Sequence, residues 1–354
     1  MNGKNATAHH KLSMPESKPS LRLIVAGTGP FAVPTLEALW SSNHHVLALA
    51  TRPIEDAGKR RKSAPNPMRD CGQRLGIPIR EFSDINADSS LVWLRQQAAD
   101  LLVVCDFGQL LSDSALATAR LGGINLHGSL LPRYRGAAPV AWAIYHGESI
   151  TGVTVIHMTR SLDGGPIIAS SPLAIDQRET AGELEARLAQ LGPDVVLKAI
   201  EQLATWDGKS PCGTVQDTQL ASSARRLRKG DGLILWKRSA QDLANQVRAF
   251  QPWPGSFTFY HPPHRPPLRL ILLEVEVVAA PPGPRDDDCL APGEFAFVDN
   301  HSLWVQTGDG WLAIRRLQPA GKGPMSIGEF LRGHRLTKGE SFACETVPNI
   351  GPHG

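Results

Sequence analysis

Short β-rich apolar runs alternate with amphipathic segments from Leu21 to about Ala204, and this alternation limits the fold more than any other feature of the chain. Such a pattern is typical of a parallel, doubly wound sheet covered by helices. Strands are predicted over residues 21–26, 45–50, 77–80, 101–105, 124–127, 152–157 and 167–173. A long helix with a broad apolar face, residues 180–203, then closes the unit. We therefore expect an α/β domain over residues 21–205.

The pattern changes after residue 205. Residues 206–232 are polar and rich in glycine, so we interpret them as a linker. A helix is predicted over 239–250, and short alternating runs follow at 256–260, 268–277, 294–298, 302–306 and 311–317. Short strands between Pro/Gly-rich turns favour a small β-barrel over residues 233–336. Trp253, between two prolines, is expected to pack between the domains. Residues 1–20 are predicted to be a disordered tail and residues 337–354 a second tail.

Composition limits the classes of protein to which this chain can belong. The 354 residues are 42% hydrophobic, which is enough for two globular domains, and the net charge is only +3. A polyanionic partner would therefore have to meet a local basic cluster. Five scattered cysteines without a Cys-x-x-Cys pair argue against a disulfide framework or a structural zinc site. No apolar run approaches the roughly 20 residues that cross a bilayer, so we expect a cytoplasmic protein. We also expect a monomer.

Asn125 and His127 stand two residues apart at the end of a predicted strand. Residues i and i+2 of a strand project from the same face, so these side chains point together. An amide can donate to a developing oxyanion, and an imidazole can exchange a proton near neutral pH. The pair is plausible as half of an acyl-transfer site. Asp163, in a predicted loop before Gly164 and Gly165, would orient the imidazole if the fold brings it within reach.

A second motif follows the first predicted strand. Residues 27–32 satisfy the Gly-x-Gly-x-x-Ala form of the dinucleotide fingerprint. The acidic residue that usually holds the ribose about 20 positions later is missing, and Thr51 and Arg52 stand there instead. We interpret the glycines as a structural turn. Because Arg52 is compatible with NADP, an NADP-dependent oxidoreductase stays open as an alternative.

Together these motifs resemble the folate-dependent formyltransferases. The resemblance rests on Asn125-x-His127, on Asp163 in Leu-Asp-Gly, and on two segments that follow His127, residues 129–132 and 135–139. It is strongest for the branch that formylates methionyl-tRNA and covers about residues 21–333. The motifs that favour this branch are residues 25–28 with 31–32, residues 248–254, and residues 317–322 with 325–326.

The resemblance implies a Rossmann-like catalytic domain followed by a smaller OB-like barrel. It also implies transfer of the formyl group of 10-formyltetrahydrofolate to the amino group of methionyl initiator tRNA, without a metal ion. In that reaction Asn125 would bind the formyl oxygen, His127 would assist proton movement and Asp163 would orient His127. The positions implied for the folate are Ser129, Leu130, Leu131 and Pro132, with Phe107 and Gly108 lining the same pocket.

Two basic clusters have the composition of either solvated surface or phosphate-binding sites. The resemblance favours contact with the acceptor arm of tRNA, by the loop after the second strand and by the end of the linker. The residues concerned are Arg52, Lys59, Arg60, Arg61 and Lys62 in the loop, and Arg225, Arg226, Arg228 and Lys229 in the linker.

Some residues depart from the family pattern, and some alternatives stay open. The family commonly has Ala-Tyr-Gly where this chain has residues 106–108, so Asp106 adds a carboxylate; Gly164 replaces a threonine. A sugar-nucleotide N-formyltransferase is the nearest enzymatic alternative, although it would not need the C-terminal barrel. A tRNA-binding protein without catalysis is disfavoured because Asn125, His127 and Asp163 are all present.

Overall fold

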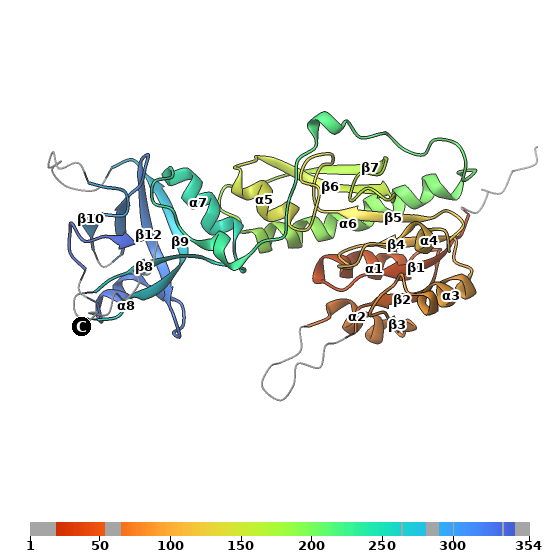
Figure 1. Ribbon diagram of the computed structural model, residues 1–354, viewed down its shortest axis with the longest axis horizontal. Coiled ribbons are helices and arrows are strands. Elements are labelled where there is room, and N and C mark those ends of the chain that lie inside the picture. The colour runs from red at the N-terminus through yellow and green to blue at the C-terminus, as the bar shows by residue number, and fades with distance from the viewer. Residues whose placement is uncertain are drawn as a thin grey trace, which may run out of the picture.

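The computed structural model describes residues 19–53, 65–262, 265–280, 290–299, 301–334 and 336–343. Within these ranges the chain forms two units, each built on its own seven-stranded sheet. The units lie end to end, so that the molecule is elongated (Figure 1). The N-terminal unit carries the residues predicted to be catalytic, and the C-terminal unit corresponds to the predicted barrel.

The N-terminal sheet has the strand order β3-β2-β1-β4-β5-β6-β7. Strands β1 to β5 pair in parallel, whereas β6 and β7 pair antiparallel, so the expected mostly parallel α/β fold is confirmed. The strands are β1 (Arg22–Ala26), β2 (His45–Thr51), β3 (Ile79–Glu81), β4 (Leu101–Val104), β5 (Gly123–His127), β6 (Ile150–His157) and β7 (Ile167–Ala174). The chain order reverses between β1 and β4, and such a switch point leaves a crevice at the carboxyl ends of the strands.

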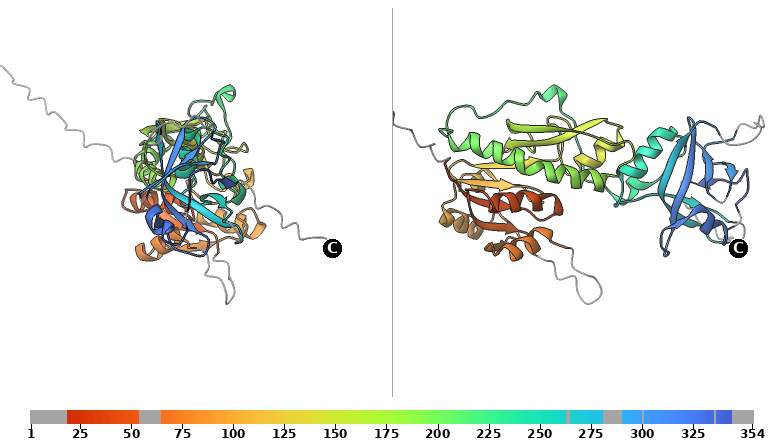
Figure 2. Two further views of the ribbon diagram at one scale, coloured as in Figure 1. Left: turned by 90° about the vertical axis from the view of Figure 1, so that its left-hand side faces the viewer. Right: turned by 180° about the vertical axis from the view of Figure 1, so that it is seen from behind.

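Helices flank this sheet. Their bounds are α1 (Val33–Trp40), α2 (Pro67–Leu75), α3 (Asp88–Gln97), α4 (Asp113–Leu116), α5 (Pro139–Tyr145) and α6 (Ala181–Ala204), with a 3₁₀ turn η1 (Pro30–Ala32) before α1. Helix α6 begins with a capping box, in which Thr180 and Glu183 satisfy each other's backbone N–H groups. Its apolar face packs against α1, β6 and β7. The helix begins beside the second unit, where the Gly182 N–H donates to the Gln251 carbonyl oxygen, and runs away from it along the N-terminal unit (Figure 2).

The C-terminal sheet is antiparallel and curls into a half-barrel, which agrees with the expected OB-like architecture. Its strands are β8 (Ser256–Tyr260), β9 (Leu268–Val278), β10 (Phe295–Val298), β11 (Leu303–Gln306), β12 (Trp311–Pro319), β13 (Met325–Ser326) and β14 (Phe342–Ala343); α7 (Ala240–Ala249) and α8 (Ile327–Leu331) complete the unit. Strand β14 lies within residues 337–354, which the sequence predicts to be a tail. It pairs with β8, and Phe342 packs against Phe295 and Trp236. A two-residue strand has no periodicity that a sequence could reveal.

The junction of the two units is aromatic. Phe250, at the C-terminal end of α7, is 1% exposed and stacks on Tyr145 of α5 with ring centroids 5.3 Å apart. Arg238 donates to the Tyr145 hydroxyl at 2.7 Å. Trp253, in contrast, is 50% exposed, so the expectation that it packs between the domains is wrong. The chain turns after α7 and carries residue 253 outward, while Phe250 still faces α5.

The segment between the units runs back along the N-terminal unit before it reaches the junction (Figures 1 and 2). Thr214 exchanges two backbone hydrogen bonds with Ile167 at the start of β7. Ala224, which is fully buried, exchanges backbone hydrogen bonds with the loop before α5. We call residues 214–224 the strap. No helix in the described part of the chain is long and apolar enough to cross a membrane.

The aromatic junction generates a stability prediction. Phe250→Ala removes a buried ring from the core, so we expect the free energy of unfolding to fall by about 3–5 kcal/mol. Trp253→Ala removes a larger but half-exposed ring three residues away and should cost about 1 kcal/mol or less. Urea unfolding followed by circular dichroism measures both variants. Equal losses would contradict the assignment of Phe250 as the packing residue.

Candidate active site

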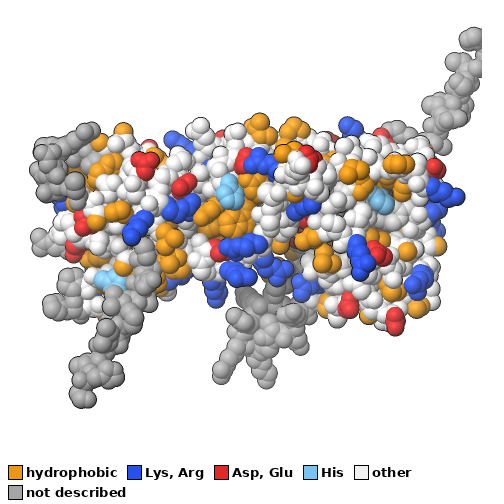
Figure 3. All heavy atoms as spheres, turned by 45° about the horizontal axis from the view of Figure 1, so that its top comes forward, with side chains coloured by type: hydrophobic (Ala, Val, Ile, Leu, Met, Phe, Trp, Pro, Cys, Tyr) orange, Lys and Arg blue, Asp and Glu red, His pale blue; other side chains and the backbone are white. Residues whose placement is uncertain are grey.

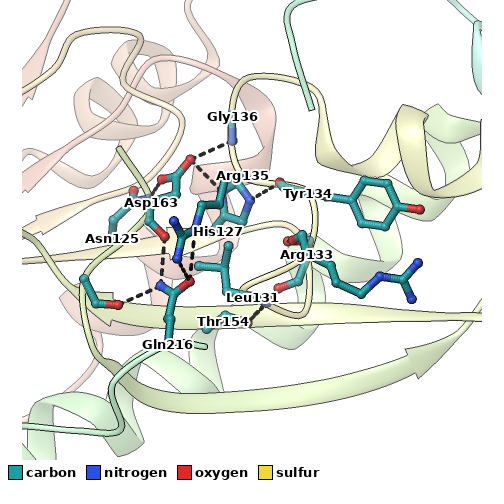
Figure 4. A network of polar contacts seen from close by, with 12 residues as sticks. Asn125, His127, Leu131, Arg133, Tyr134, Arg135, Gly136, Thr154, Asp163 and Gln216 are labelled. Atoms are coloured by element: carbon teal, nitrogen blue, oxygen red, sulfur yellow. Dashed lines mark hydrogen bonds and ion pairs between the residues drawn. The ribbon is translucent and has the colours of Figure 1, made fainter. Parts of the chain in front are cut away.

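Asn125 and His127 lie in the last three residues of β5, at the carboxyl edge of the sheet. His127 is 6% exposed, and both side chains turn toward the loop between β6 and β7, as the alternation of a strand requires (Figure 4). That loop carries Asp163. The structure therefore brings together the three residues that the sequence suggested as catalytic.

The carboxylate of Asp163 contacts both partners. Its Oδ1 accepts from Asn125 Nδ2 at 3.3 Å, and its Oδ2 lies 3.7 Å from His127 Nδ1. The backbone N–H of Gly136 donates to Oδ2 at 2.8 Å and fixes the carboxylate from a third segment. The Asp163 side chain is only 9% exposed, so these contacts are formed with little competition from water.

The second ring nitrogen of His127 determines which atom exchanges a proton. Nε2 lies 2.8 Å from the carbonyl oxygen of Tyr134, and a carbonyl can only accept, so Nε2 carries a hydrogen. Nδ1 then faces the site with the Asp163 carboxylate on its side. A proton can be taken up or released at Nδ1 while the Tyr134 contact keeps the ring in place.

The predicted folate segment is a loop whose own polar groups are largely engaged. Ser129 Oγ donates to the carbonyl oxygen of Arg133 at 2.7 Å. Thr154 Oγ1 donates to the Ser129 carbonyl and accepts from the Leu131 N–H. Leu131 is buried, while Leu130 and Pro132 are half-buried. The segment thus lies directly after His127, but the Ser129 hydroxyl is held within the loop.

The segment after β4 forms the other side of the site. Phe107 is buried, Gly108 is exposed with a φ of +75°, and Leu110 is 67% exposed. The Arg52 guanidinium reaches over Gly108, where an added Cβ would lie 3.3 Å from Nη1. Gly108 leaves its backbone groups uncovered, and Leu110 offers an apolar surface beside them. Such a combination suits a flat ring system that packs on the apolar surface and also bonds to backbone groups. Leu110 was missed because one exposed leucine has no distinctive sequence signal.

Asp106 adds a carboxylate at the switch point. It has a φ of +47°, and a Cβ added at Gly29 would overlap its Oδ2. Asp106 is an exposed residue, but the protein around its carboxyl group partly desolvates it, and this desolvation raises its pKa to about 6. Burial, and then the charge of Asp106, also raise the pKa of Glu185 on α6. Two carboxyl groups with raised pKa values therefore lie close to each other at the switch point.

The basic residues separate into groups. Lys59, Arg60, Arg61 and Lys62 lie outside the described residues. Arg225 pairs with Asp231 at 2.7 Å and lies over the Trp142 ring, so it already takes part in packing. Arg226, Arg228 and Lys229 are exposed. Lys and Arg side chains gather near the middle of the molecule, where the two units meet (Figure 3). A groove of about 220 Å³ at this junction is lined by both Arg225 and Arg238.

Sequence reasoning missed Gln216 as well. It is 6% exposed and bonds to Arg135 and to the turn that carries Asp163, yet it belongs to the segment interpreted as a linker. A glutamine in a polar stretch has no signal that distinguishes it from surface residues. Among the residues that the structure describes, no three His, Cys, Asp or Glu side chains gather as metal ligands would.

Both units of the chain match families of known proteins. Residues 21–200 match the family described as Formyl transferase, and residues 226–335 match Formyl transferase, C-terminal domain. The chain belongs to the formyl transferase family. A protein from Rhodopirellula baltica named methionyl-tRNA formyltransferase is 43% identical over 91% of this chain and 97% of its own length. A protein of the same name from Coxiella burnetii is 35% identical over 89% of this chain and 96% of its own length.

Solved structures share the fold of this formyl transferase. HypX from Aquifex aeolicus, in complex with tetrahydrofolic acid, aligns over 89% of this chain and 47% of its own, with a TM-score of 0.56 and 13% identity. An N-formyltransferase from Helicobacter canadensis, in complex with folinic acid and dTDP-3-aminofucose, aligns over 83% of this chain and 98% of its own, with a TM-score of 0.59 and 16% identity. At these identities the likeness concerns the fold alone.

The glycine turn of this formyl transferase has a structural reason. A Cβ added at Gly27 would lie 2.8 Å from the carbonyl oxygen of Cys105, and Gly29 makes room for Asp106. The glycines therefore let β1 and β4 approach closely. Together with the family match, this favours the structural interpretation of residues 27–32 over an NADP-dependent oxidoreductase.

Asp106 generates a pH-dependent prediction. Its folded-state pKa of about 6 lies above the value of about 3.9 in an unfolded chain, so folding favours the protonated form. The stability linked to that proton is fully present below about pH 4 and is lost as the pH rises through 6. Asp106→Asn carries no such proton. We expect its melting temperature to exceed that of the wild type at pH 7.5, and the difference to shrink between pH 6 and pH 4. A difference that grows toward pH 4 would contradict this account.

Proposed function

We propose that this formyl transferase moves the formyl group of 10-formyltetrahydrofolate to the amino group of methionyl initiator tRNA, in the cytoplasm. The observation that carries the chemistry is the meeting of Asn125, His127 and Asp163 at the carboxyl edge of the sheet. The acceptor is supported by the relatives named methionyl-tRNA formyltransferase, which align with nearly the whole chain.

The reaction needs little covalent help from the protein. The acceptor nitrogen attacks the formyl carbon and the C=O electron pair moves to oxygen. That pair then re-forms the C=O bond as the bond from carbon to the donor nitrogen breaks and its electrons go to that nitrogen. One proton leaves the acceptor nitrogen and one is taken up by the donor nitrogen. Asn125 Nδ2 is placed to donate to the developing oxyanion, and His127 Nδ1 is placed to move the proton. Asp163 keeps the imidazole oriented and stabilises its charged form.

For the formyl donor we assign Ser129, Leu130, Leu131 and Pro132 as one wall and Phe107 and Gly108 as the other. The buried loop fixed by Thr154 supports the first wall, and the bare backbone at Gly108 beside exposed Leu110 supports the second. Because the Ser129 hydroxyl is engaged within its loop, Ser129 would act through its backbone and through the shape of the loop. The fold of tetrahydrofolate-bound HypX agrees with a folate site of this kind.

For the tRNA we assign the exposed basic residues around the junction of the two units. Arg52 lies beside Gly108 at the rim of the site, and Arg226, Arg228 and Lys229 extend from the strap toward the C-terminal unit. The loop residues Lys59, Arg60, Arg61 and Lys62 belong to the same proposal. Phosphate contacts of this kind position a nucleic acid without reading its sequence. Arg225 contributes mainly through its contacts with Asp231 and Trp142.

An acceptor assay tests the proposal. Purified protein is given formyltetrahydrofolate with methionyl initiator tRNA, methionyl elongator tRNA or an amino sugar nucleotide, and formylated product is measured. We expect formylation of the initiator tRNA. Asn125→Ala and His127→Ala should each lower kcat by about 10²- to 10⁴-fold, as loss of an oxyanion donor or a proton carrier does. His45→Ala, an exposed histidine in β2, is the matched control. Formylation of the sugar nucleotide alone would overturn the acceptor assignment.

Salt dependence tests the basic surface separately. Phosphate contacts release counterions, so binding weakens steeply with ionic strength. We expect KM for methionyl-tRNA to rise at least about tenfold between 50 and 200 mM salt, with kcat nearly unchanged. Initial rates at several salt concentrations measure this. A flat KM would count against phosphate recognition while leaving the chemistry of the site intact.

A further inference from the structure

The strap brings a buried amide into the neighbourhood of the catalytic residues. Gln216 lies between two attachments of the strap, one where Thr214 pairs with Ile167 and one where Ala224 pairs with Arg135. The second attachment depends on Gly136, whose φ is +120° and whose Cβ, if present, would lie 2.7 Å from the Ala224 carbonyl oxygen. Backbone contacts on both sides therefore fix Gln216 against the N-terminal unit.

Every hydrogen-bonding group of the Gln216 amide has a partner. Nε2 donates to the carbonyl oxygens of Asp163 at 2.8 Å and of Gly165 at 2.7 Å. Oε1 accepts from Arg135 Nε at 3.1 Å and Nη2 at 2.7 Å. The two carbonyls can only accept and the guanidinium can only donate, so the amide has a single orientation (Figure 4). At 6% exposure the network is nearly closed to water.

These bonds hold both segments that place the catalytic carboxylate. Asp163 has a φ of +49°, a left-handed conformation that is strained for a non-glycine residue and persists only where its surroundings maintain it. Gln216 bonds to the backbone of that residue. It also bonds to Arg135, the residue next to Gly136, and the Gly136 N–H holds Asp163 Oδ2. One side chain thus ties the Asp163 turn to the loop that fixes its carboxylate.

We propose that Gln216 is a positioning residue for formyl transfer, which holds the Asp163 carboxylate beside His127 without touching substrate. The strap between the two units is then part of the active site. This inference rests on the proposed function, because formyl transfer is its readout. A displacement of about 1 Å at a catalytic group can lower a rate about 100-fold, so a single buried amide is sufficient for a measurable effect.

The test uses the full-length protein and steady-state initial rates of transfer of a labelled formyl group. Gln216→Met keeps the length of the side chain and removes all four hydrogen bonds. We expect kcat to fall about 10- to 100-fold, with KM for methionyl-tRNA changed less than about twofold. Gln219→Met, an exposed glutamine three residues along the strap region, is the matched control and should keep wild-type kcat. Unchanged kcat in Gln216→Met would overturn the proposal.

A double-mutant cycle separates positioning from a general structural role. If Gln216 acts through Asp163, then Gln216→Met in an Asp163→Asn background should lower kcat by less than about threefold. If Gln216→Met lowers kcat in the Asp163→Asn background as much as it does in the wild type, Gln216 does not act through the carboxylate and the proposal is refuted. Gln216→Glu provides a second variant if Gln216→Met does not fold. It keeps the acceptors for Arg135 but loses both N–H donors, and we expect the same non-additivity; an additive loss would also refute the proposal.

The acceptor assay, applied to the wild type and to Gln216→Met, distinguishes this inference from the proposed function. If the wild-type protein formylates none of the offered acceptors, the proposed function fails. If the wild type formylates initiator tRNA and Gln216→Met does so equally well, only the role of Gln216 fails.

Discussion

The Oδ2 atom of Asp163 accepts the backbone N–H of Gly136, while the same carboxylate faces Asn125 and His127 at the end of β5. Three segments meet at this one side chain: a strand, the loop that follows it, and the turn between β6 and β7. Each segment could be displaced by a small shift of its own backbone. The carboxylate keeps them in register because it has two oxygens and is nearly closed to water.

The sheet creates the conditions for this meeting. Parallel strands bring their carboxyl ends to one edge, and the reversal of chain order between β1 and β4 opens a crevice there. Strands β6 and β7 then run antiparallel and return the Asp163 turn to the edge at which β5 ends. The histidine ring is held by the Tyr134 carbonyl at Nε2, which leaves Nδ1 for proton exchange. The position of the Asp163 turn and the orientation and protonation site of the His127 ring are thus determined by backbone groups as much as by side chains.

The two units are joined by more than a connecting segment. Phe250 inserts from the C-terminal side into the aromatic junction at α5, and α5 begins just after the loop that carries Gly136. The strap runs back over the N-terminal unit and bonds to the same loop. Both the aromatic junction and the strap therefore adjoin the loop whose Gly136 N–H holds the Asp163 carboxylate. This arrangement gives the C-terminal unit a physical route to the site that a free linker would lack.

The sequence by itself determined the features that depend on residues close together in the chain. Apolar periodicity located the strands of the N-terminal sheet, and the spacing of two residues placed Asn125 and His127 on one face, because strand geometry is fixed by the backbone alone. Tertiary structure alone decided which distant groups meet. Gln216 reaches the Asp163 turn, Phe250 rather than Trp253 fills the junction, and burial raises the pKa of Asp106 to about 6. These outcomes depend on how the chain folds back on itself, and residues far apart in sequence leave no local pattern that records their contact.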